Sequence, residues 1–431
     1  MSPAQGVSSL IFVATLVIIL SERLDATIVA MAGGVAMVTV GTAMGFYSQG
    51  QALRSVDFDT LGLLLGIMIL ALLLEKTGFF QYMAILAGKL SRGNPWVLLI
   101  MLGSTTTLLS TVMPNVTVIV LIVPVTILIA EILGISPVPL LMAEALFSNT
   151  GGVATLVGDP PNVMIASAAG FSFNDFLTHT APLVLMCLLA ALIVLRVVYR
   201  AELGEPPKNV EALMRLDERQ ALTDPRGMNK VLIVLGMVIL LFLVQGPLGL
   251  TSAFIALAGA AAGLVWVRPS MEETLKGMEW SLLLFFAGLF VTVGGLEAAG
   301  VLDLLASVVA ALAQANLLLA SVSVLVGAAL VSTVVNNIPL TIALIPIVAG
   351  VGDLGVPTSP LWWALALGAG LGGNATIMGA TPNMVAVALS QKTRVPITSR
   401  LWMRAGLPVM IVTCFVATVL FVVFFGWMKT P

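Results

Sequence analysis

Two short stretches of the sequence carry the polar side chains and irregular backbone that could bind a ligand, and they are nearly copies of each other. Residues 151–162 read GGVATLVGDPPN and residues 372–383 read GGNATIMGATPN, with seven of twelve positions identical. Both stretches lie inside long apolar segments. Within a membrane, backbone that leaves the helix is tolerated only where it is buried in protein or lines a polar cavity. Two such breaks at corresponding places in two halves of a chain are typical of the binding site of a secondary transporter.

A single carboxylate distinguishes the two breaks. Asp159 stands in the first break, where the second has Ala380. A carboxylate near the middle of a membrane costs about 2.5–3.5 kcal/mol on insertion scales and is a functional candidate by default. We expect Asp159 to be the coupling residue, which carries H⁺ or ligates a cation; the alternative is that it caps the following helix. Glu144 is the second candidate for proton coupling, and its alternative is a position at the membrane edge.

Amide and hydroxyl side chains make up the rest of the expected site. Asn115 and Asn337 are predicted to lie at the turns of two helical hairpins, beside Thr111 and Thr333. Asn at a turn often only forms the turn, but two at corresponding positions facing the breaks favour contact with a ligand. The same interpretation applies to the polar residues inside the breaks, which are Thr155, Asn162, Asn374, Thr376 and Asn383.

The segments that hold the breaks and hairpins contain no fixed positive charge. No Lys or Arg occurs between Arg92 and Arg196, or between Lys276 and Lys392. A site for a multiply charged anion would place a cation against it, so citrate-like and phosphate-like substrates are disfavoured without a co-bound cation. Half-helix N-termini favour anionic or hydrogen-bond-accepting ligands, and unwound carbonyls favour Na⁺ or hydroxyl donors.

The composition is that of a protein embedded in a lipid bilayer. Of 431 residues, 59% are hydrophobic and 9% charged, against about 25% charged in a soluble protein, and the mean hydropathy is +1.11. No basic patch indicates a nucleic acid partner. No nucleophile–base pair or metal-binding cluster indicates an enzyme, so we expect no cofactor and no metal site.

Apolar segments divide the chain into two halves, residues 1–200 and 231–431, joined by a hydrophilic linker at 201–230. We expect five spans in each half. They are Val7–Leu20, Ala26–Gly45, Leu61–Leu74, a broken span Pro137–Ala169 and Ala181–Tyr199, then Val231–Gln245, Ala253–Val267, Ser281–Leu296, a broken span Leu361–Ser390 and Ala405–Trp427. Polar residues interrupt Asn94–Glu131 and Ala315–Gly350, which therefore read as re-entrant hairpins. An amphipathic segment, Gln81–Leu90, is expected to lie at the membrane surface.

The two halves align at a steady offset, which indicates a duplication. An offset of 222 pairs Gly66 with Gly288 and Glu75 with Glu297, and an offset of 221 pairs the two breaks. The offset of 222 also pairs the hairpin residues Ser110, Thr111, Val112, Asn115 and Pro124 with Ser332, Thr333, Val334, Asn337 and Pro346. Low complexity could imitate the apolar matches, but not those of Asn, Pro and Thr.

Basic residues predict that the repeats are inverted. Seven cluster around the linker, which places it in the cytoplasm by the positive-inside rule: Arg196, Arg200, Lys208, Arg215, Arg219, Arg226 and Lys230. Residues 170–180 contain none, whereas the corresponding residues 391–404 contain Lys392, Arg394, Arg400 and Arg404. Corresponding segments thus fall on opposite faces of a cell inner membrane. The predicted fold is an all-α polytopic membrane protein of two inverted repeats, each with a hairpin and a broken helix.

The motifs resemble those of the ion transporter superfamily. SNTGGVATLVGDPPNVMI and LWWALALGAGLGGNATIMGATPNMVA are similar to its paired signatures, and STVVNNIPLTIALIPI is similar to its second hairpin. The branch is the one that holds the arsenite permease ArsB, the melanosomal P protein and the sodium/proton antiporter NhaD. The resemblance implies an alternating-access cycle, often in a homodimer, with ligands held between hairpin tips and breaks. Carried over by position, the substrate- and ion-binding residues it implies are Ser110, Thr111, Asn115, Gly151, Gly152, Thr155, Asn162, Ser332, Thr333, Asn336, Asn337, Gly372, Gly373, Asn374, Thr376 and Asn383.

Our hypothesis from the sequence is proton-coupled efflux of arsenite or antimonite, with Asp159 or Glu144 carrying the proton. Trivalent arsenic is a neutral trihydroxide near pH 7, which suits a site of amides, hydroxyls and carbonyls. The linker could dock a cytosolic arsenite-stimulated ATPase. Two alternatives stay open: a Na⁺/H⁺ antiporter that uses the same carboxylates as cation ligands, and a sodium-coupled transporter of carboxylates or other anions.

Overall fold

The computed structural model describes residues 2–21, 23–204 and 206–430, and every regular element in these ranges is a helix. The all-α prediction is therefore confirmed. The first half contains α1 (Pro3–Leu20), α2 (Ala26–Met44), α3 (Gln49–Arg54), α4 (Phe58–Glu75), α5 (Phe79–Leu90), α6 (Pro95–Ser110), α7 (Asn115–Leu133), α8 (Val138–Gly152), α9 (Pro160–Ala169), α10 (Phe173–His179) and α11 (Ala181–Val198).

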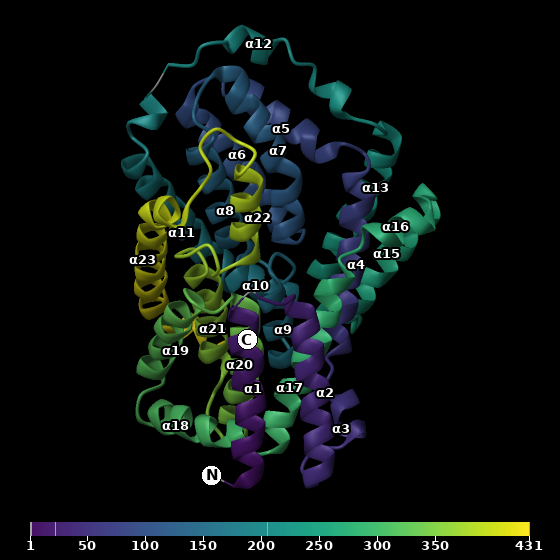
Figure 1. The fold of residues 1–431 in the computed structure, drawn as a ribbon, viewed down its shortest axis with the longest axis vertical. Coiled ribbons are helices and arrows are strands. Elements are labelled where there is room, and N and C mark those ends of the chain that lie inside the picture. The colour runs from purple at the N-terminus through teal and green to yellow at the C-terminus, as the bar shows by residue number, and fades with distance from the viewer. Residues whose placement is uncertain (1, 22, 205, 431) are drawn as a thin grey trace.

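The second half follows a corresponding order. It contains α13 (Pro225–Leu243), α14 (Gln245–Leu248), α15 (Ser252–Val267), α16 (Met271–Gly277), α17 (Trp280–Ala298), α18 (Val301–Ala315), α19 (Leu317–Ser332), α20 (Asn337–Asp353), α21 (Ser359–Gly372), α22 (Thr381–Ser390), α23 (Ser399–Val423) and α24 (Phe425–Met428). Both predicted hairpins are pairs of helices, α6 with α7 and α19 with α20. Figure 1 shows α5 and α18, which correspond in the alignment, toward opposite ends of the molecule.

Length and composition make eight of the described helices able to cross a membrane. They are α1, α2, α4, α7, α11, α13, α17 and α23. Shorter apolar helices include α6, α15, α18, α19 and α20. This is the pattern of a polytopic membrane protein. Of the shorter helices, α6, α19 and α20 belong to the two hairpins, whereas α15 packs on α4 and α13. The inverted orientation and the count of five spans in each half stay predictions.

Two glycines allow close backbone contact between the two halves. The helix α2 packs on α17, and α4 packs on α15, so each pair takes one helix from each half. A Cβ on Gly66 would lie 2.5 Å from the main-chain carbonyl carbon of Ala256, and a Cβ on Gly288 would lie 2.6 Å from that of Ala30. These are the glycines matched by the offset of 222. Both contacts place backbone against backbone, and neither leaves room for a side chain.

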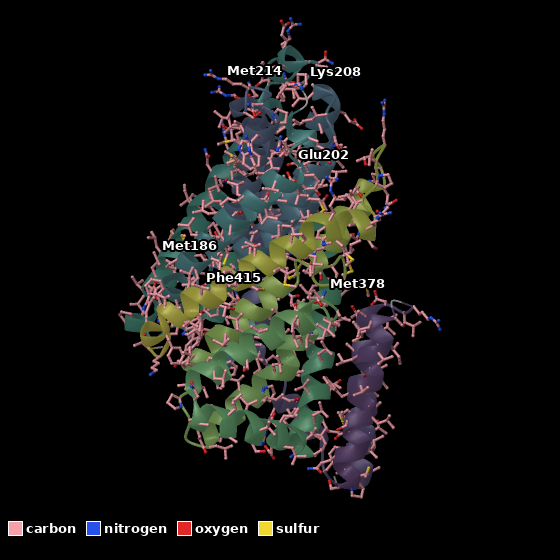
Figure 2. The ribbon with its side chains drawn as sticks, turned by 90° about the vertical axis from the view of Figure 1, so that its left-hand side faces the viewer. Met186, Glu202, Lys208, Met214, Met378 and Phe415 are labelled. Carbon is pink, nitrogen blue, oxygen red and sulfur yellow. The ribbon has the colours of Figure 1, made fainter. Side chains whose placement is uncertain are left out.

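The linker crosses one end of the molecule as a strap. Before α13 begins at Pro225, its described residues form the short helices η1 (Glu202–Gly204), α12 (Val210–Met214) and η2 (Glu218–Ala221). The backbone N–H of Lys208 donates to the carbonyl of Leu133 at the end of α7, at 2.8 Å, and Lys89 on α5 pairs with Glu218. Figures 1 and 2 show this strap at the top of the molecule, and Lys208 and Met214 are labelled in Figure 2.

Replacing Gly66 or Gly288 with alanine is expected to lower the thermal unfolding midpoint of the purified protein. The added Cβ meets backbone, which cannot rotate away, and overpacking of this kind costs about 1–3 kcal/mol. Gly236→Ala on α13 is the matched control, because its Cβ would meet nothing within 4 Å. Equal unfolding midpoints for the three variants would contradict the packing described here.

Candidate functional site

The two breaks begin and end in the same way. The helix α8 ends at Gly152 and α21 ends at Gly372. The residue before the second half-helix is extended in both copies, with φ −137° at Asp159 and −151° at Ala380. Proline follows in the first turn of α9 and of α22, where its missing N–H costs no hydrogen bond. A glycine pair and a proline in the local sequence therefore specify where each helix stops and the next one begins.

A threonine ties each break to the tip of its own hairpin. In the first break, the hydroxyl of Thr155 donates to the carbonyl of Thr111 and accepts from the N–H of Gly158 at 3.1 Å. In the second, the hydroxyl of Thr376 donates to the carbonyl of Thr333 at 2.6 Å and accepts from the N–H of Gly379 at 3.1 Å. The predicted pairing of hairpin tips with breaks is thus present in both halves.

An asparagine closes each break from within. Nδ2 of Asn162 donates to the carbonyls of Gly152 and Thr155, at 3.0 and 2.8 Å. Nδ2 of Asn383 donates to the carbonyls of Gly373 and Thr376, at 2.8 and 2.9 Å. These four carbonyls are therefore already hydrogen-bonded, although a carbonyl oxygen can accept a second bond from a ligand.

Asp159 connects the first break to the hairpin of the other half. Its side chain makes no capping hydrogen bond to α9. Instead it accepts a hydrogen bond from Nδ2 of Asn337, at 2.9 Å, and only 6% of Asp159 and 4% of Asn337 are exposed. The side chain of Asp159 therefore does not cap α9, and its role in coupling stays a prediction.

The remaining tip residues bind within their own half. With its amide oriented to suit its neighbours, Nδ2 of Asn115 lies 2.8 Å from the carbonyl of Gly158. The hydroxyls of Ser110 and Ser148 lie 2.8 Å apart, and Ser332 donates to the carbonyl of Ala369 at 2.8 Å. Nδ2 of Asn336 lies 3.3 Å from the hydroxyl of Thr381. Asn115 and Asn337 correspond in the alignment but differ in contact, because only Asn337 reaches a carboxylate.

Glu144 lies apart from Asp159. It is fully buried in α8, where it accepts a hydrogen bond from Thr126 on α7, and its second oxygen has no partner among the described residues. Eight residues separate it from Gly152, which is about 12 Å along a helix. The structure therefore does not bring the two predicted coupling carboxylates together.

Two polar residues that matter here were not among the predicted site residues. Asn149 and Thr150 directly precede the first break, and both hydrogen-bond across to Asn374 of the second. Their position, as two adjacent polar residues at the end of an apolar segment, is the sequence feature that could have identified them. Asn149 escapes a search for recurring residues because the corresponding position in the second half is Gly370.

Two cavities at corresponding places reach the site. One, of about 410 Å³, is lined by Asn336, Thr381, Met378 and Met384 on one wall and by the ends of α1, α2 and α17 on the other. Figure 2 places Met378 beside the upper end of α1. The other cavity, of about 310 Å³, has Leu156 and Val163 on the site wall and a polar opposite wall of Asp59, Thr60, Gln245, Thr251 and Ser252. The second cavity thus has the more polar lining of the two, because polar side chains form one of its walls.

Comparisons with known proteins agree with this architecture. A family model described as "Citrate transporter" (CitMHS) matches residues 16–368. An uncharacterized transporter of Mycobacterium tuberculosis (strain ATCC 25618 / H37Rv) is 38% identical over 415 residues, covering 95% of this chain and 96% of that protein. The human P protein is 30% identical over 478 residues, covering 92% of this chain and 57% of the P protein. The crystal structure of the Alcanivorax borkumensis YdaH transporter is similar in fold, with a TM-score of 0.63, 16% identity, and coverage of 95% of this chain and all of that one.

Thr155→Val and Thr376→Val are each expected to lower the thermal unfolding midpoint. Valine keeps the shape of threonine but cannot form its hydrogen bonds. The N–H of Gly158 or Gly379 and the carbonyl of Thr111 or Thr333 each lose a partner, at a cost of about 1–3 kcal/mol for each buried group. Thr39→Val is the matched control, since that hydroxyl is exposed and bonds only to its own helix. If the three variants have the same unfolding midpoint, the hydrogen bonds of Thr155 and Thr376 do not hold the breaks in place.

Proposed function

We propose that this chain, which belongs to the citrate transporter family and is a membrane transporter, exports arsenite and antimonite in exchange for protons. The observation that carries the proposal is the hydrogen bond between Asp159 and Asn337. It joins the two halves through one buried carboxylate, beside helices that contain no Lys or Arg.

Protonation of Asp159 would change that bond directly. An ionised carboxylate accepts a charge-assisted hydrogen bond from the Asn337 amide, which is roughly twice as strong as a neutral one. When the carboxylate takes up a proton, the charge disappears and the bond to the second hairpin weakens. Proton binding at Asp159 and release of the hairpin are therefore linked, and this linkage is what coupled transport requires.

The chemistry around the second hairpin suits a small uncharged cargo. Arsenite near pH 7 is a neutral trihydroxide, so the amide of Asn336 and the hydroxyl of Thr381 can exchange hydrogen bonds with it. Both side chains line the 410 Å³ cavity, together with Met378 and Met384. Thioether sulfur is a soft, polarisable group, and it is a better neighbour for trivalent arsenic or antimony than for a hard anion.

A second candidate cargo is citrate bound to a cation. The family description names citrate, and a trianion in helices without Lys or Arg would need a cation beside it. Carboxylate and amide oxygens are ligands that a divalent cation accepts, so Asp159 could hold such a cation against the substrate.

A Na⁺/H⁺ antiporter would use the same carboxylate for Na⁺.

Transport by the purified protein in proteoliposomes separates these candidates. With a pH gradient imposed, the proposal expects arsenite and antimonite to move against the proton flux and to dissipate the gradient. Dissipation of the gradient by Na⁺ without arsenite would replace the proposal with the antiporter. Citrate uptake that requires Mg²⁺ or another divalent cation would replace it with the citrate–cation complex.

Asp159→Asn is expected to reduce proton-driven transport at least about tenfold, which corresponds to about 1.4 kcal/mol, while the protein remains folded. Asparagine has the size of aspartate but cannot exchange a proton. Asp303→Asn is the matched control, because Asp303 is an exposed carboxylate in the first turn of α18. Normal proton-coupled transport by the Asp159 variant would remove Asp159 from the mechanism.

A further inference from the structure

A cluster of three buried amides lies where the two breaks meet, and the proposed function does not use it. Asn149 is near the end of α8, and Asn374 and Asn383 belong to the second break. Nδ2 of Asn149 lies 3.0 Å from Oδ1 of Asn374 and 2.7 Å from Oδ1 of Asn383. Asn149 is 2% exposed, and the other two are fully buried.

The hydrogen bonds leave the amide of Asn383 one orientation. A primary amide has two N–H groups and one carbonyl oxygen. Asn149 directs both of its N–H groups at carbonyl oxygens, and Asn383 directs both of its own at the carbonyls of Gly373 and Thr376. A flipped Asn383 would set its nitrogen against that of Asn149 and its oxygen against two carbonyls.

We propose that Asn149 is a positioning residue through which the first half sets the geometry of the second break. Asn383, held by Asn149, binds the carbonyl of Thr376, and the hydroxyl of Thr376 binds the hairpin tip at Thr333. Four residues further along, Asn337 meets Asp159 of the first half. These hydrogen bonds and the hairpin tip thus connect Asn149 of the first half, through the second half, to Asp159 of the first half.

The corresponding contact in the other break has no amide. The offset of 221 pairs Asn149 with Gly370 and Asn374 with Val153. These two residues also meet, because a Cβ on Gly370 would lie 2.2 Å from a methyl group of Val153. Close apolar packing therefore joins the halves at this place without amides, whereas the contact of Asn149 with Asn374 and Asn383 adds hydrogen bonds.

Hydrogen exchange measured by mass spectrometry on the full-length protein tests the proposal without reference to any cargo. Asn149→Ala should speed exchange about tenfold, as expected for loss of buried hydrogen bonds, in residues 373–383 and 333–337. The first break, residues 152–162, should keep its protection. Unchanged exchange in the second break, or equal loss of protection in both breaks, would overturn the proposal.

The chain supplies its own control for packing. The double variant N149G/N374V copies the Gly370–Val153 contact at the place of the amide contact. If Asn149 only fills space, the double variant should recover the protection of the second break, and that recovery would overturn the proposal. If Asn149 positions Asn383, the second break should stay unprotected in the double variant.

Asn149→Asp covers the case in which the smaller variant does not fold. Aspartate has the same shape but offers no N–H to Asn374 or Asn383, so it should loosen the second break in the same way. With a cargo established, the proposal also expects a lower maximal rate with little change in KM, because cargo contacts are kept while Asn337 is displaced from Asp159. A variant with the protection and the maximal rate of the wild type would contradict it.

Discussion

Backbone groups buried away from water must find hydrogen-bond partners, and this constraint shapes the centre of the molecule. Each break unwinds a helix and releases N–H and carbonyl groups inside an apolar protein. In the first break Thr155 and Asn162 bind one of these N–H groups and two of these carbonyls, and Thr376 and Asn383 bind the corresponding groups of the second. The threonines also bind the hairpin tips. Each break is therefore joined to its own hairpin, because the threonine that binds an N–H of the break also binds a carbonyl at the hairpin tip.

The two units share a framework but differ in the polar contacts between them. Asp159 faces Asn337, whereas the residue that corresponds to Asp159 is Ala380. Asn149 faces Asn374 and Asn383, whereas its counterpart is Gly370. The two cavities differ as well, because one has a wall of polar side chains and the other is lined mostly by apolar ones. The two halves thus have matching supports, and they differ in the polar residues that lie between them.

The recurring residues could be predicted from the sequence, and the contacts between halves could not. The offsets of 221 and 222 identify the breaks, the hairpin turns and the close-packed Gly66 and Gly288, because matching backbone demands leave matching residues. Asn149 has no counterpart to reveal it. Whether Asp159 caps α9 or crosses to Asn337 depends on a side-chain direction, and the position of Glu144 against Thr126 depends on which face α8 turns to α7. The spacing of residues in the sequence predicts neither of these two contacts.

The central claim is that Asp159 changes protonation beside Asn337 of the opposite hairpin, and that the bond between them weakens when Asp159 takes up a proton. Infrared difference spectroscopy of the protein on a pH step reads this most directly, because a protonated carboxyl group has its own carbonyl stretching band. The account predicts a band that appears on acidification, shifts when Asn337 is replaced with alanine, and is absent from Asp159→Asn. A wild-type carboxyl band that survives in Asp159→Asn without change would contradict it.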